Sequence, residues 1–384
     1  MRTPLLLLSC LVIWLGTSAQ SFLEFGAQNA VWTNYQVGGS FQAGGRSVPQ
    51  LSIGDSFNNE LVDAEIALNI AGYQHVNPGK LPHGEFVAKP YRLWTRYSNQ
   101  QLEIRLGLQK INFGSADLLR PLMWFDHLDP RDPLQQTDGV WAALGRYYFL
   151  NNANIWLWLI YPENKRRTWE LLPSDQTFPE WGGRVQHPLG NGEVAMSFHR
   201  RNVNQTAIKT PGDESVVAEH RFGIDGKWDW LLGCWFEATI TQSAISVDNY
   251  RNQSMLNIGT DYTFGLGNGL HVTVEQLFVS FAPEIFASTI ENSTFSALSI
   301  SYPKSIFDQL NLITYYDWTS SQAYTFASWK HQFKHIDMHL LAWVNPEVYR
   351  IPTQEQAGLN FAGKGIQLMI VYNFSKRNNK NQND

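Results

Sequence analysis

Cysteine and charge are both scarce in this 384-residue sequence. It has only two cysteines, Cys10 and Cys234, and Cys10 lies in the apolar N-terminal segment. A single remaining cysteine excludes an intramolecular disulfide and a thiolate metal site. Charged residues make up 16% of the chain, against about 25% in soluble domains. The slightly acidic net charge of −5 offers no basic surface for nucleic acid, and we expect no nucleic-acid partner.

Long apolar runs are also lacking beyond the first residues of the chain. Residues 5–15 are mainly apolar, follow Met1-Arg2 and lead into Gly16-Thr17-Ser18-Ala19. This pattern predicts a secretory signal peptide over residues 1–19, cleaved after Ala19. A lipoprotein box ending at Cys10 is the less favoured alternative, because the apolar run continues past it. No later stretch approaches the about 18 consecutive apolar residues of a spanning helix, so any membrane span must be made of strands.

Aromatic residues, by contrast, are abundant, at 14% of the chain. Near its end, residues 365–374 alternate so that one face is apolar throughout: Ile366, Leu368, Ile370, Tyr372 and Phe374. An apolar face that finishes in two aromatics is typical of the closing strand of an outer-membrane β-barrel. Its last aromatic is the usual recognition mark for the barrel-insertion machinery, which we expect as a partner. Residues 375–384 are predicted to form a polar periplasmic tail.

Similar alternating segments recur along the chain about every 20 residues, as tilted membrane strands with loops do. Clear examples are residues 64–70, 102–108, 256–264 and 270–274, each with its charges opposite the apolar stripe. We predict an all-β fold, a transmembrane antiparallel β-barrel over residues 20–374. Counting strands gives seventeen, and adding a weak strand near residues 46–54 gives eighteen, with sixteen as the fallback. A large secreted β-sandwich or propeller is the alternative.

The predicted connections alternate between short and long. Short ones rich in Asn, Asp and Gly, which suit tight hairpins, are expected at residues 98–100, 151–152, 189–192, 225–227 and 265–269. Long ones are expected at residues 112–137, 163–179, 202–216, 244–252 and 282–289. Bacterial barrels have short periplasmic turns and longer outer loops, so we expect the long set to face outward.

Residues 115–133 form the segment to which we assign function. They are too apolar for a surface loop and too rich in proline and charge for a strand. Because large exposed apolar patches are uncommon, we predict that this loop folds into the barrel lumen and constricts it. Charged side chains would then line the passage and select solutes: Arg120, Asp126, Asp129, Arg131 and Asp132. The alternative is that these charges pair with one another and hold the loop in place.

The run Gly107-Leu-Gln-Lys-Ile-Asn-Phe-Gly114, followed by a loop ending in Asp-Pro-Arg-Asp-Pro, carries a resemblance. It is similar to a pattern in outer-membrane porins of the alginate-export and related type, including barrels from Bacteroidota. The resemblance covers about thirty residues directly and implies a pore lined by arginines. Arg105 and Arg146 are among the arginines that could face inward, but acidic residues such as Glu103 could face inward too, and a mixed lumen of that kind argues against a polyanionic substrate.

Other candidate sites are weaker. Asp126, His127, Asp129 and Asp132 lack the glycine-turned spacing of a calcium loop. His331, His335, Asp337 and His339 would share one face of a single strand, but a polar lumenal row explains them without a metal. Five tryptophans fit an interfacial girdle better than a sugar-binding surface: Trp156, Trp158, Trp228, Trp230 and Trp235. We therefore predict no metal site and no cofactor.

These observations favour a passive outer-membrane channel for small polar or charged solutes, because a barrel of this size leaves an aqueous lumen. An enzyme is not expected, since the sequence contains no G-x-S-x-G elbow and the serine nearest the histidine group, Ser328, would lie on the opposite face. The alternative is a non-conducting barrel that acts as a scaffold or as a subunit of an outer-membrane complex. Membrane lipid or lipopolysaccharide, which the basic run at residues 165–167 would contact, is an expected partner, and a homo-oligomer is an open possibility.

Overall fold

The structure, a computed structural model, describes residues 20–79, 81–204, 217–247, 250–284, 287–347 and 361–381. The predicted signal peptide lies outside these residues. The described residues form eighteen strands: β1 (Gln20–Gln36), β2 (Ser40–Phe57), β3 (Glu60–Val76), β4 (His83–Ser98), β5 (Leu102–Gln109), β6 (Val140–Tyr148), β7 (Asn154–Ile160), β8 (Glu180–Leu189), β9 (Gly192–Val203), β10 (Val217–Asp229), β11 (Gly233–Val247), β12 (Tyr250–Phe264), β13 (Leu270–Ala282), β14 (Glu291–Pro303), β15 (Asp308–Asp317), β16 (Gln322–Gln332), β17 (Ile336–Val344) and β18 (Lys364–Asn381). No helix in this part of the chain is long and apolar enough to cross a membrane.

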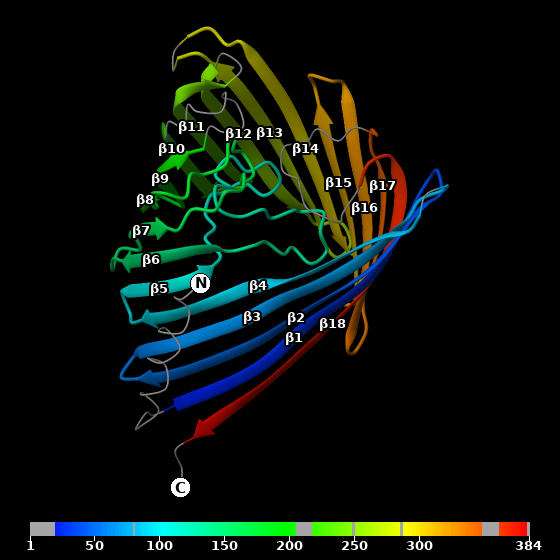
Figure 1. Ribbon diagram of the computed structural model, residues 1–384, viewed down its shortest axis with the longest axis horizontal. Coiled ribbons are helices and arrows are strands. Elements are labelled where there is room, and N and C mark those ends of the chain that lie inside the picture. The colour runs from blue at the N-terminus through cyan, green and yellow to red at the C-terminus, as the bar shows by residue number, and fades with distance from the viewer. Residues whose placement is uncertain are drawn as a thin grey trace.

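Each strand pairs antiparallel with its neighbours in sequence, and β1 pairs with both β2 and β18. The sheet is thereby closed into a barrel (Figure 1). Closure pairs the first strand with the last and so leaves no terminal strand free, as a strand-built structure in lipid requires. The predicted fold class and the strand count of eighteen are confirmed, and the weak strand expected near residues 46–54 is part of β2.

The predicted end of the barrel at Phe374 is wrong, because β18 continues to Asn381. Its residues 375–381 pair in register with residues 20–26 of β1. Ladder hydrogen bonds come from the backbone, so a polar segment continues a strand as readily as an apolar one when its partner strand extends equally far. The segment assigned to a polar tail is therefore mostly barrel wall.

Side chains alternate between the two faces of the wall. In β13, Thr273, Glu275 and Leu277 are buried inside the barrel, whereas Val274 and Phe278 are exposed on the outside. The same alternation leaves large apolar side chains exposed over the outer surface of the other strands. An apolar exterior of this extent is what a hydrocarbon environment requires.

The connections divide the barrel into two ends. Both described termini lie at one end, with the short turns at residues 58–59, 99–101, 149–153 and 190–191, and we call it the short-turn end. The long connections at residues 110–139 and 161–179 lie at the other, the long-loop end, which also carries the short turns at residues 37–39 and 318–321. Asn58, Asn59 and Asn152 adopt positive φ angles of 47°, 66° and 64° in the short turns, as tight hairpins need. Two predicted connections are wrong. Residues 225–227 lie within β10, which turns after Asp229, and residues 244–252 lie mostly in β11 and β12.

Candidate functional site: the inward loop and the inner wall

The connection between β5 and β6, residues 110–139, crosses the interior of the barrel, and we call it the inward loop (Figure 1). Its apolar side chains are almost fully buried, including Ile111, Leu119, Leu122 and Trp124. They pack in two groups, one against the inner wall at β6 and β7 and one against β12 to β17. The two groups lie on opposite sides of the barrel, so the loop spans the lumen.

Two carboxylates of the inner wall hold the tip of this loop. Glu237 of β11 accepts hydrogen bonds from Ala116 N at 2.8 Å and Leu122 N at 3.0 Å. Glu275 of β13 accepts three, from the backbone nitrogens of residues 117, 118 and 119 at 2.7, 3.1 and 2.6 Å. We call Glu237 and Glu275 the carboxylate clamp. It satisfies buried amides of a segment that has no ladder partner.

Each of the two glycines in the motif at residues 107–114 is required by a different feature of the structure. Gly107 has a φ of +118°, and a Cβ there would lie 2.1 Å from the carbonyl oxygen of Leu93 in β4. Gly114 has a φ of +102°, and a Cβ there would lie 2.3 Å from Glu237 Oε1. Only glycine tolerates both the angle and the close approach. The motif therefore begins the inward loop and brings it against the clamp.

Further contacts fix the rest of the inward loop. The guanidinium of Arg131 lies 4.7 Å from the ring centroid of Phe326 in β16 and 5.4 Å from that of Phe361. Gln136 donates a hydrogen bond to Gln28 in β1, and the Arg92 guanidinium donates to the Thr137 carbonyl at 2.9 Å. The loop is thus bound to strands distributed around much of the barrel.

A second connection, residues 161–179 between β7 and β8, also packs inward. Trp169 donates from Nε1 to the Arg120 carbonyl at 2.7 Å, and Thr168 donates to the Asp126 carbonyl at 3.0 Å. Sequence analysis expected this segment to face outward because it is one of the long connections, and expected its basic run, residues 165–167, to contact lipopolysaccharide. Arg167 is instead buried and paired with Glu180 at 2.6 Å, whereas Lys165 and Arg166 are exposed.

An ionic cluster joins this second loop to the wall at β8 to β10. Its three arginines and three glutamates are all buried and balance in charge: Arg167, Arg201, Arg221, Glu170, Glu180 and Glu219. The Arg201 Nε to Glu219 Oε1 distance is 2.6 Å and the Arg221 to Glu170 distance is 2.9 Å. Mutual pairing of this kind compensates the cost of removing the ions from water. The cluster consequently fixes the loop and adds no net charge to the lumen.

The five predicted residues of the inward loop are likewise buried. Arg120 contacts Asp126 at 3.3 Å, and Arg131 Nε contacts Asp129 Oδ1 at 2.9 Å. Asp132 accepts a hydrogen bond from Leu134 N at 2.9 Å, and burial raises its pKa to about 6. This geometry is what the structural alternative predicts, in which these charges hold the loop. A role for them in solute selection stays a prediction.

The three predicted wall residues come together on the inner face, near the short-turn end. Glu103 lies 3.1 Å from Arg146 and 3.2 Å from Arg105. Arg96 of β4 lies 4.0 Å from Glu103 and 2.7 Å from Asp63. We call these five residues the inner-wall patch. Their side chains are 10–25% exposed, unlike the loop charges, so they contact the solvent of the lumen and give it a local excess of one positive charge.

Sequence analysis missed the carboxylate clamp and most of the ionic cluster. No local pattern marks Glu237 and Glu275 as loop anchors, because their partners are backbone amides more than a hundred residues away in the sequence. The histidine row is also wrong: residues 333–335 form the turn between β16 and β17, and His331 pairs with Asp308 at 2.7 Å. Trp156, Trp158 and Trp235 face inward rather than forming a girdle. Among the described residues, no group of three or more potential ligands is placed to hold a metal.

The barrel shares its fold, but little of its sequence, with solved porins. OccK5 of Pseudomonas aeruginosa aligns with a TM-score of 0.54 at 9% identity, over 94% of this chain and 99% of that one. OccAB1 of Acinetobacter baumannii gives 0.54 at 8% identity, over 93% and 96%. OccAB4 of the same organism gives 0.53 at 6% identity, over 95% and 99%. The fold is that of an outer-membrane porin barrel. No protein-family model and no curated protein matches the sequence.

Proposed function

We propose that this protein is an outer-membrane channel for passive diffusion of small polar or charged solutes, and that the inward loop narrows its pore. The observation that carries the proposal is the clamped loop: a segment between two wall strands crosses the lumen and is bound on its far side by Glu237 and Glu275. A loop held across the lumen reduces the cross-section that is free for solutes, and leaves a passage beside it. Porin architecture supports the outer-membrane location.

The partly exposed charged side chains of the inner-wall patch support small solutes as the substrate class. The inner-wall patch combines Arg96, Arg105 and Arg146 with Asp63 and Glu103, so its net charge is small. An alginate-type exporter would need a strong excess of arginine facing a polyanion. Mixed and partly exposed charges instead suit solutes of either sign with a modest preference for anions.

A non-conducting barrel is the second candidate, and one observation favours it. Many lumenal residues are almost completely buried beneath the inward loop and the connection at residues 161–179. They include Trp343, Tyr324 and Leu277 on the β13 to β17 side. A lumen filled by side chains on one side conducts only through what remains on the other. A scaffold or subunit of a membrane complex needs no open path at all.

Single-channel recording in planar bilayers distinguishes the two candidates. We would compare the intact barrel with a variant in which residues 117–132 are replaced by a short glycine–serine linker. Stable steps in the intact barrel that enlarge in the variant support a channel constricted by the inward loop. A folded barrel that is silent in both forms overturns the channel and favours the scaffold. Folding is verified first by the strand signal in circular dichroism and by heat-modifiable migration in gels.

Silence of the intact barrel with conductance only in the variant would mean that the loop plugs the pore. That result supports the position of the loop and overturns passive diffusion through the resting protein. A variant with the same linker in place of residues 318–321, the short connection between β15 and β16, is the matched control and should conduct as the intact barrel does.

A further inference from the structure

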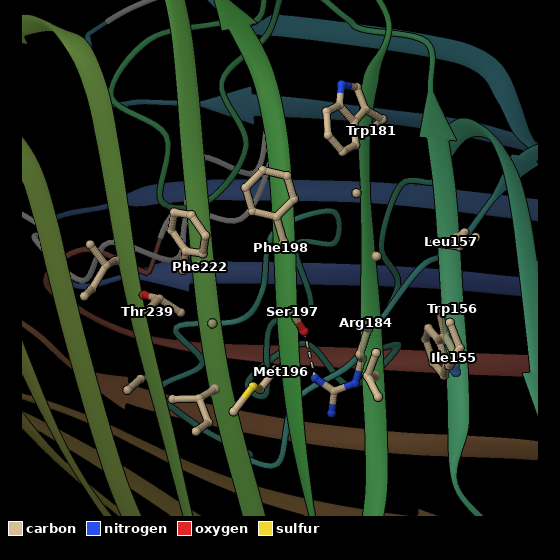
Figure 2. Close-up of a pocket in the computed structure, with 17 residues that line it drawn as sticks. Ile155, Trp156, Leu157, Trp181, Arg184, Met196, Ser197, Phe198, Phe222 and Thr239 are labelled. Carbon is tan, nitrogen blue, oxygen red and sulfur yellow. Dashed lines mark hydrogen bonds between the residues drawn. The ribbon is translucent and has the colours of Figure 1, made fainter.

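An apolar groove runs along the outer face of the wall at β7 to β11, away from the lumen. It has a volume of about 620 Å³. Figure 2 shows Trp181, Phe198 and Phe222 gathered at one end of the groove and Met196 toward the other. Gly183 and Ala238, which carry little or no side chain, also line it. Met196 and Phe222 are 65% and 52% exposed, so the groove is open to whatever surrounds the barrel.

The apolar surface of these strands ends at one level. Toward the long-loop end, Phe198 of β9 is followed on the outer face by Arg200, and Phe222 of β10 by His220. Register places Arg200 opposite His220, and His220 opposite Gln242 of β11. Three neighbouring strands therefore change from apolar to polar at positions that are paired in register, next to Trp181 of β8, which is paired with Arg200. In a membrane, this is the height at which hydrocarbon gives way to lipid headgroups.

A second hollow of about 820 Å³ continues the groove beyond that level. His220 and Gln242 line it, together with Arg251 of β12 and one carboxylate, Glu284. The apolar groove thus leads toward a polar hollow whose lining includes one arginine, one histidine and one carboxylate. The ring of His220 stacks on Phe198, with 6.1 Å between centroids and an interplanar angle of 24°, which fixes the imidazole at the junction.

We propose that this outer groove binds one molecule of a phosphorylated, multiply acylated lipid of the lipopolysaccharide type. An acyl chain occupies the groove beside Phe222 and Met196, and a phosphate is bound by Arg200 and His220. Arginine is the side chain best suited to phosphate, which it binds through two parallel N–H donors. The positive charge of Arg200 and its place at the apolar-to-polar junction favour this occupant over a second copy of the chain, whose apolar exterior would leave Arg200 without an anion.

The proposal rests on the membrane location given above, and goes beyond transport to a bound partner of the wall. Its test uses the full barrel reconstituted in phosphatidylcholine vesicles, with insertion verified by protection from protease. Native mass spectrometry then measures binding of hexa-acylated lipid A and of the same lipid stripped of phosphate. We expect the phosphorylated lipid to bind at least about tenfold more tightly, because a phosphate–arginine contact contributes that much.

Two variants separate the parts of the site. Arg200→Gln should abolish the preference for phosphate and leave binding of the stripped lipid unchanged. Ala238→Phe should fill the groove and weaken binding of both lipids. Lys304→Gln in the turn between β14 and β15 and Val274→Phe on the outer face of β13 are the matched controls, and both should bind as the original protein does.

Equal binding of the two lipids, or Arg200→Gln with the original preference, overturns the phosphate site. Efficient self-crosslinking of Met196→Cys, in a Cys234→Ser background, overturns the lipid in favour of a second copy. A barrel that does not insert overturns the membrane location as well as the lipid site. A barrel that inserts without preferring lipid A overturns the lipid site alone.

Discussion

Removal of the carboxylate clamp should release the tip of the inward loop while leaving the barrel intact. The double variant Glu237→Ala, Glu275→Ala takes the acceptors from five backbone amides. A buried amide without a partner costs about 1–3 kcal/mol, so the double change costs about 5–15 kcal/mol. Burial of Leu118, Leu119 and Leu122 opposes release with about 5–9 kcal/mol. The single variants should therefore loosen the tip, and the double variant should free it.

Cysteine labelling measures release without relying on conductance. Leu119, which is fully buried, is changed to cysteine in a Cys234→Ser background, and a membrane-impermeant maleimide is added to the reconstituted barrel. Labelling should be slow with the clamp present, faster in either single variant and fastest in the double variant. Single-channel conductance should rise in the same order. Glu193→Ala, which removes an exposed carboxylate that accepts a hydrogen bond from Gln186 and lies outside the clamp, is the matched control.

The free energies given above are refuted if, in a folded barrel, the cysteine at position 119 is labelled as slowly in the double variant as it is with the clamp present. That result would mean that apolar packing alone holds the loop and that the five hydrogen bonds contribute little. Faster labelling with unchanged conductance would place the narrowest part of the pore elsewhere, and would contradict the proposed role of the inward loop.

Three other perturbations follow from particular contacts. Glu103→Gln raises the positive excess of the inner-wall patch from one charge to two. The reversal potential in a KCl gradient should therefore move toward anion selectivity. An unchanged potential would show that ions do not pass the patch. Asp129→Asn removes the carboxylate of a buried ion pair with Arg131 and should destabilise the barrel by about 3–5 kcal/mol. The double variant Asp129→Leu, Arg131→Met should recover most of that loss. Thermal melting measures the stability of both variants. Asp132 has a pKa raised from 3.8 to about 6 by burial, so its protonated form is favoured in the folded state and stability falls as the pH rises through 6. Asp132→Asn should therefore be more stable than the original protein at pH 8 by up to about 3 kcal/mol and equal to it at pH 4, and a pH-independent difference would refute this account.

The strands and their number could be predicted from the sequence, because both depend on local patterns of alternation. A period of two with apolar residues on one face is a property of each segment, as in residues 64–70 and 270–274, and it fixes which side faces outward. The end of β18 was missed because residues 375–381 have no apolar face. Their place in the wall is set by the length of β1, a partner from the opposite end of the chain.

The inward loop marks the boundary between what the sequence alone determines and what tertiary structure decides. Its apolar composition was enough to predict that it leaves the surface, because apolar surface of that size is not left in water. Its anchors were not predictable. Glu237 and Glu275 bind amides rather than cations, and the pairing of Arg131 with the rings of Phe326 and Phe361 joins residues about two hundred positions apart. Chemical complementarity between such distant groups exists only after the barrel has closed, so the wall follows from local periodicity and the content of the lumen from the fold as a whole.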